Sequence, residues 1–192
     1  MPSSEYDLRY IQAVVDQLED YLLSQILYWP IGIRPSAGAP SYPKLTLGGL
    51  LFARTRASAM PKSEAETNKF EQLDAAINQA RTKWTVNWEK KAARGFQARL
   101  TLWRNFIEDY RVEPSSQYDR YAYEVGRRVQ LELLGHETNS IPAAAFDLLK
   151  NLDIILQTTL VPGHFIWEKV LETGFPADPY WYLYGCLPSR ME

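Results

Sequence analysis

The two histidines of the chain are the side chains best suited to metal or acid–base chemistry. Each stands four residues from a glutamate, in the pairs Glu132–His136 and His164–Glu168. Residues four apart share one face of a helix, so the two pairs could bring two imidazoles and two carboxylates to one metal ion. Di-iron bundle proteins use Glu-x-x-His pairs instead, and a histidine at the end of a helix is favoured there by the helix dipole alone. A metal-dependent or small-molecule enzyme using these four residues is one functional hypothesis.

A basic stretch over residues 81–104 is the second candidate site. Seven cations accompany one acidic residue, Glu89, and four large rings are interleaved with them. The cations are Arg81, Lys83, Lys90, Lys91, Arg94, Arg99 and Arg104, and the rings are Trp84, Trp88, Phe96 and Trp103. Cations interleaved with aromatic rings suit a nucleic-acid backbone and its bases. The stretch is therefore a candidate site for nucleic acid or another anion, with Lys83, Lys90, Lys91 and Arg94 as the contact residues.

The same stretch has a second interpretation, because its rings fall on the apolar phase of a helix and would then be core residues. Its cations would pair with acidic neighbours inside the protein. The first helix offers such neighbours, since Asp16, Glu19 and Asp20 lie together on its exposed side. Exposed pairs of this kind contribute only about 0–1 kcal/mol each. Of the two interpretations, we expect the internal pairing.

Five large rings gather within ten residues near the end of the chain. They are Phe175, Tyr180, Trp181, Tyr182 and Tyr184. Clustered tyrosine and tryptophan are typical anchors of protein interfaces. The same rings could equally cover the end of a helical bundle. The run is the candidate partner-binding site, and the sequence leaves the choice between interface and core open.

Composition and motifs argue against several other functions. The chain has no nucleotide-binding glycine motif, nucleophile elbow or zinc-ligand spacing, and we expect no cofactor. Its single cysteine, Cys186, excludes an intrachain disulfide. The net charge of −2 gives the chain as a whole no long-range attraction to nucleic acid or membranes. No signal-peptide pattern and no apolar run of about 20 residues is present, so we expect a cytoplasmic protein without a membrane partner.

Apolar periodicity predicts an all-α domain over residues 1–192. Apolar positions at spacings of three and four predict a first helix that Pro30 ends. Four prolines and two glycines make residues 30–44 a Pro-rich loop. From Phe70 to Tyr110 the apolar positions recur about every 3.6 residues, which is the α-helical repeat.

That unbroken phase predicts one long helix over residues 63–111, with Gly95 and Thr82–Thr85 as the places where a kink would fit. Shorter helices follow, one of them over residues 161–174, and Asp178-Pro179 could open a last short turn. No strand is predicted. The fold class is therefore an irregular helical bundle organised along one central helix.

These features favour a non-enzymatic helical interaction protein, which would act as an adaptor or as a subunit of a complex or homo-oligomer. The long helix, the surplus of aromatic rings and the Pro-rich loop fit this function better than they fit a catalytic pocket. Nucleic-acid binding through residues 81–104 and an enzyme using the two Glu/His pairs remain as the alternatives.

Overall fold

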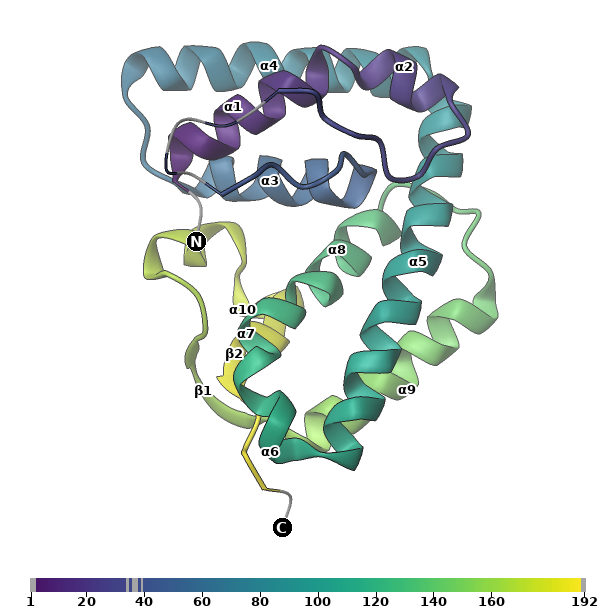
Figure 1. The fold of residues 1–192 in the computed structure, drawn as a ribbon, viewed down its shortest axis with the longest axis vertical. Helices are drawn as coiled ribbons and strands as arrows, with labels where there is room; N and C mark the ends of the chain where they lie inside the picture. The colour runs from purple at the N-terminus through teal and green to yellow at the C-terminus, as the bar shows by residue number, and fades with distance from the viewer. Residues whose placement is uncertain (1–2, 34, 36–37, 39, 191–192) are drawn as a thin grey trace.

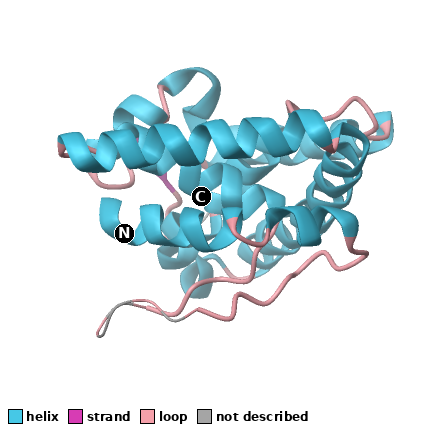
Figure 2. Cartoon of the chain, turned by 90° about the horizontal axis from the view of Figure 1, so that it is seen from above, coloured by secondary structure: helices cyan, strands magenta, loops and turns pink. Residues whose placement is uncertain are grey.

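The computed structural model describes residues 3–33, 35, 38 and 40–190, and helices dominate it (Figure 1, Figure 2). This confirms the all-α class. The helices are α1 (Ser4–Val15), α2 (Leu18–Leu23), α3 (Leu47–Ala59), α4 (Glu64–Lys83), α5 (Thr85–Val112), α6 (Pro114–Gln117), α7 (Tyr121–Glu124), α8 (Gly126–Gly135), α9 (Ala143–Thr159) and α10 (Ala177–Tyr180). Part of the predicted Pro-rich loop, residues 34, 36–37 and 39, lies outside the described residues. None of the described helices is long and apolar enough to cross a membrane.

The prediction of one continuous helix over residues 63–111 is wrong, because the segment forms two helices, α4 and α5, that separate at Trp84. This break falls within Thr82–Thr85, one of the two places where a kink would fit the sequence. Trp84 has φ −119° and ψ 38°, outside the helical region. The hydroxyl of Thr85 donates to the carbonyl oxygens of Arg81 and Thr82, and such bonds to the preceding turn bend helices. Consequently α4 runs alongside α1 and α2, whereas α5 turns away and runs beside α8 (Figure 1).

Two groups of helices meet around one hydrophobic core. Helix α1 packs against α3 and α4, and α5 packs against α8 and α9. Helix α3 joins the groups by packing against both α1 and α8 (Figure 1). Among the largest fully buried side chains are Trp88, Trp103, Tyr21 and Tyr182. Much of the aromatic surplus therefore fills the core.

A small antiparallel sheet and a short 3-10 helix (Lys169–Gly174) replace the helix predicted over residues 161–174. Strand β1 (Val161–Phe165) pairs with strand β2 (Tyr184–Cys186). A Cβ atom on Gly185 would lie only 2.5 Å from the carbonyl oxygen of Val161. A residue with a side chain could not sit there without a shift, so this glycine allows the strands their close approach.

Candidate functional site

The two Glu/His pairs do not form the predicted metal site. Glu132 is on α8, its Oε1 lies 3.3 Å from Nε2 of His136, and its Oε2 accepts a hydrogen bond from Arg128. His164 is exposed on β1, and Glu168 precedes a 3-10 helix, so this pair shares no helix face. Within the described residues, no group of three or more His, Cys, Asp or Glu side chains is placed to hold a metal ion.

The aromatic run near the C-terminus lies mostly inside the protein. Phe175, Tyr180 and Tyr182 are buried in the core, and Trp181 and Tyr184 are half-buried. Phe175 packs edge-on against Tyr180, whose ring meets Tyr182 in the same way. Three of the five candidate partner-binding rings are thus core residues that offer no surface to a partner. The core alternative, which the sequence left open, holds for them.

Carboxylates pair with the first cations of the basic stretch. Nζ of Lys83 lies 3.2 Å from a carboxylate oxygen of Glu19, in the acidic face of the first helices, and both side chains are exposed. Nε of Arg81 lies 2.9 Å from a carboxylate oxygen of Glu137. The expected internal pairing is therefore confirmed for Lys83 and Arg81, and at the far end of the stretch Arg104 pairs with Glu108 at 3.6 Å.

The next polar residues of the stretch bind backbone carbonyls at the end of α2 instead. Asn87, Lys91 and Arg94 follow one another on one face of α5, and each donates a hydrogen bond across to this end. Their acceptors, in the same order, are the carbonyl oxygens of Leu22 (3.1 Å), Ile26 (2.5 Å) and Gln25 (2.9 Å). Leu22 is in the last turn of α2, whereas Gln25 and Ile26 follow the helix, so the two cations bind carbonyls just beyond its end. The basic face of α5 therefore anchors the C-terminal end of α2.

Lys91 is buried to 2% exposure, so its ammonium meets polar neighbours inside the protein rather than solvent. Besides Ile26, its ammonium contacts the hydroxyl of Ser24 at 3.2 Å and lies 4.1 Å from the centre of the Tyr21 ring. Burial, helped by the positive charge of Arg94, lowers the pKa of Lys91 to about 8. Such a group is a functional candidate in principle. Its contacts indicate a structural role, because they hold α2 and α5 together.

We expect the free energy of unfolding to rise between about pH 8 and pH 10 because of Lys91. The lysine keeps its ordinary, higher pKa in the unfolded chain, so in this window the unfolded chain binds more protons than the folded one. Raising the pH then favours folding. Buried tyrosines lower the free energy of unfolding above about pH 10. Burial raises the pKa of Tyr21 to about 12, so in that range the folded chain binds more protons than the unfolded one. Urea unfolding across the window should show the rise in the unmodified protein and in Lys90→Met. The same rise in Lys91→Met would contradict this assignment.

A groove beside this anchor is lined by residues of α2 and α5. We call it the α2–α5 groove; its cavity is about 360 Å³. Leu23 on α2 and Val86 on α5 line it, with exposed fractions of 48% and 63%. Lys90 and Arg94 line it too and are exposed, and Glu89 is half-buried there. The groove thus joins exposed apolar side chains to exposed cations.

The sequence predicted the cations of this groove but not its apolar part. Leu23 and Val86 are apolar, yet neither falls on the side of its helix that the apolar repeat predicts to be buried. This mismatch is the sequence signal that could have revealed the groove. The rings of the stretch do not line the groove, because Trp88, Phe96 and Trp103 are buried and the half-buried Trp84 lies outside its lining.

Comparisons with protein-family models, with curated proteins and with solved structures find no match to this chain. Its function has to be argued from its own residues.

Proposed function

We propose that this chain is a non-enzymatic, cytoplasmic interaction protein whose α2–α5 groove binds an acidic, partly apolar segment of a partner protein. The observation that carries the proposal is the meeting of exposed apolar side chains and exposed cations in one groove. Leu23 and Val86 are the exposed apolar side chains, and Lys90 and Arg94 are the exposed cations. An amphipathic helix with acidic and apolar faces matches this surface, since such helices lay their apolar face into grooves.

Charge complementarity favours an acidic occupant. Arg94 gives one N–H to the Gln25 carbonyl and keeps further donors, because a guanidinium has five. Lys91 adds a positive charge beneath the groove floor. Within the groove lining that the structure describes, Glu89 is the one carboxylate. The local charge therefore attracts carboxylates and disfavours basic segments.

A nucleic-acid occupant is less well supported. Stacking of bases needs accessible rings, and of the four rings of the stretch Trp84 is half-buried and the other three are buried. Lys83 and Arg81 already form ion pairs with Glu19 and Glu137, so they are less available to phosphates. Proteins that bind duplexes tightly through the backbone neutralise about 6–10 phosphates. The cations left in the groove fall short of that number.

The test is a fluorescence-anisotropy titration with a synthetic helical peptide that carries leucines on one face and glutamates on the other. We expect it to bind, and we expect Lys90→Glu/Arg94→Glu to weaken binding by about tenfold or more, because attraction becomes repulsion. The matched control is Lys69→Glu/Arg111→Glu, which makes the same charge change at exposed positions outside the groove and should leave the affinity unchanged.

Three results would contradict the proposal: no binding of the peptide, equal weakening by the control variant, or tighter binding of DNA or RNA oligonucleotides than of the peptide. Circular dichroism of both variants must show an intact fold for the comparison to count. Self-association in analytical ultracentrifugation that Lys90→Glu/Arg94→Glu abolishes would make a second copy of the chain the occupant instead.

A further inference from the structure

A second, smaller cavity lies at the N-terminal end of α3, away from the α2–α5 groove. We call it the α3 pocket; its volume is about 110 Å³. Tyr6 and Tyr10 of α1, the first turn of α3 and Arg99 of α5 line it. A cavity of this size is well above the minimum of about 10–15 Å³ that one water molecule needs. It can therefore hold a small ligand.

Positive charge dominates the lining of the α3 pocket. Lys44, Arg56 and Arg99 contribute to it, and no carboxylate is among the lining residues that the structure describes. The buried Asp7 binds Arg56 from behind, at 2.5 and 3.0 Å. Asp7 balances one cation, which leaves two positive charges uncompensated. The pocket therefore suits an anion of charge about −2.

Both guanidinium groups are held in place and still have N–H groups to give. Arg56 uses two of its five donors on Asp7. Arg99 gives Nε to the side-chain oxygen of Gln130 at 2.6 Å and Nη2 to the hydroxyl of Thr46 at 3.3 Å. Donors fixed before the ligand arrives lose little conformational freedom on binding. This is the arrangement of a built site rather than of flexible surface cations.

The hydroxyl of Tyr10 is the second observation that points to a ligand. The side chain is 2% exposed, and among the described residues its hydroxyl has no hydrogen-bond partner. A buried polar group without a partner is costly, so native proteins rarely leave one. The hydroxyl lies 3.3 Å from where a Cβ of Gly49 would be, and both residues line the pocket. Burial raises the pKa of Tyr10, so the hydroxyl stays protonated and can donate.

The first turn of α3 adds the polarity that anions prefer. Thr46 caps this 13-residue helix by accepting a hydrogen bond from the amide of Gly49 at 3.1 Å. The N-terminal end of a helix carries a partial positive charge, and helix N-termini bind phosphate groups for this reason. Gly49 leaves the approach open, because it places no side chain between the turn and Tyr10.

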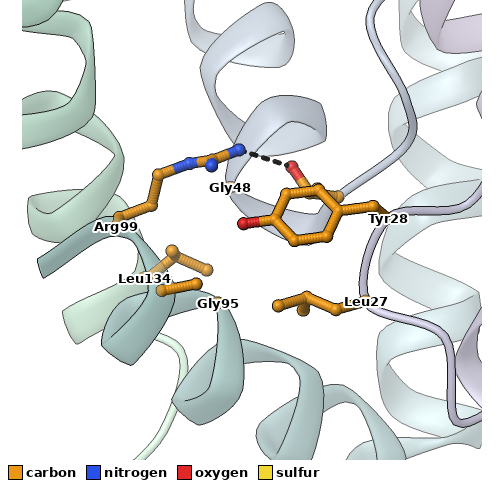
Figure 3. Close-up of a pocket in the computed structure, with 8 residues that line it drawn as sticks. Leu27, Tyr28, Gly48, Gly95, Arg99 and Leu134 are labelled. Carbon is orange, nitrogen blue, oxygen red and sulfur yellow. Dashed lines mark hydrogen bonds between the residues drawn. The ribbon is translucent and has the colours of Figure 1, made fainter. Parts of the chain in front are cut away.

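A separate slot of about 10 Å³ also borders Arg99 (Figure 3). Leu27, Gly95 and Leu134 line this slot with apolar surface, and Tyr28 lies beside Arg99. The slot is too small for more than one water molecule. A ligand must therefore sit on the Tyr10 side of Arg99.

We infer that the α3 pocket binds a tetrahedral oxyanion of the phosphate class, either inorganic phosphate or the phosphoryl group of a monoester. Donors reach the pocket from α1, α3 and α5, and a guanidinium fork fits phosphate oxygens in pairs. Phosphate groups carry about −1.5 to −2 charges at neutral pH, which matches the uncompensated charge of the site. This site is separate from the α2–α5 groove and does not depend on the function proposed for it.

Isothermal titration at constant ionic strength, with inorganic phosphate and with glycerol 3-phosphate, tests the inference. We expect binding of at least one of them to the unmodified protein. Tyr10→Phe should weaken it by about tenfold or more, because a hydrogen bond to a charged group is lost. The unliganded Tyr10→Phe protein should be at least as stable as the unmodified one, since among the described residues its hydroxyl has no hydrogen-bond partner to lose. Arg99→Met should weaken binding at least as much.

The matched control is Tyr182→Phe, which removes another buried hydroxyl without a partner, outside the α3 pocket. It should leave the affinity unchanged, as should Lys90→Glu/Arg94→Glu in the groove. Tighter binding of glycerol 3-phosphate assigns the site to a monoester, and tighter binding of inorganic phosphate assigns it to the free anion. Three results would overturn the inference: binding of neither compound, equal weakening by Tyr182→Phe, or equal heat from sodium chloride at matched ionic strength.

Discussion

A chain that ends at Gly174 should fail to fold. The truncation removes Phe175, Tyr182, Leu183 and Leu187, which are all core residues. It also removes strand β2 and leaves the buried hydroxyl of Tyr121 without its acceptor, the carbonyl of Tyr182 at 2.6 Å. Loss of one large core side chain costs about 2–5 kcal/mol, and a whole domain is stable by only about 5–15 kcal/mol. Several such losses together exceed the total stability.

Circular dichroism and cooperative thermal unfolding measure this directly. We expect the truncated chain to lose its cooperative transition and most of its helicity. A chain that ends at Ser189 is the matched control, since it keeps the buried rings and Leu187, and it should stay folded. A truncated chain that folds and only associates less well would return the aromatic run to the interface hypothesis.

Replacing Arg128 by methionine should destabilise the protein by about 3–5 kcal/mol. Arg128 is buried on α8, gives two hydrogen bonds of 2.9 Å to Asp153 of α9, and gives a third to Glu132. Its guanidinium also lies 4.6 Å from the centre of the Tyr182 ring. Removing it leaves the poorly solvated carboxylate of Asp153 without this partner and leaves Glu132 with only its contact to His136. For a chain of this length, the melting temperature should fall by roughly 10 °C.

Thermal unfolding of a matched set of variants tests this account of the α8–α9 contact. Lys150→Met, an exposed neighbour on α9, should change the melting temperature little. Arg128→Met/Asp153→Leu should recover a large part of the loss, because buried ion pairs can often be replaced by apolar residues. If the double variant were less stable than Arg128→Met alone, the loss of stability could not be explained by an unpaired carboxylate at Asp153.

The helical class follows from the sequence because a repeat of 3.6 residues is a local property. The break at Trp84 does not disturb that repeat, since the amide of Trp88 still bonds to the carbonyl of Trp84 at 2.9 Å. Two helices on the same apolar phase look like one. Strands β1 and β2 pair across an intervening segment of the chain. A pattern of neighbouring residues therefore cannot predict their pairing.

The candidate sites were predictable in part, for the same reason. The sequence identified the cations Lys90 and Arg94 of the α2–α5 groove, but the carbonyls that bind Lys91 and Arg94 are accessible only because α2 ends beside α5. The α3 pocket was missed altogether. Tyr10, Lys44, Arg56 and Arg99 lie on separate segments, and only the packing of α1, α3 and α5 brings them together.

The most direct measurement of the central claim is a charge swap between the α2–α5 groove and its peptide. The unmodified protein and Lys90→Glu/Arg94→Glu are each titrated with the glutamate-faced peptide and with a counterpart whose glutamates are all lysines. We predict an exchange of preference: the unmodified protein binds the acidic peptide more tightly, and the variant binds the basic one more tightly. If both proteins preferred the same peptide, the groove would not be the binding site and the proposed function would be contradicted.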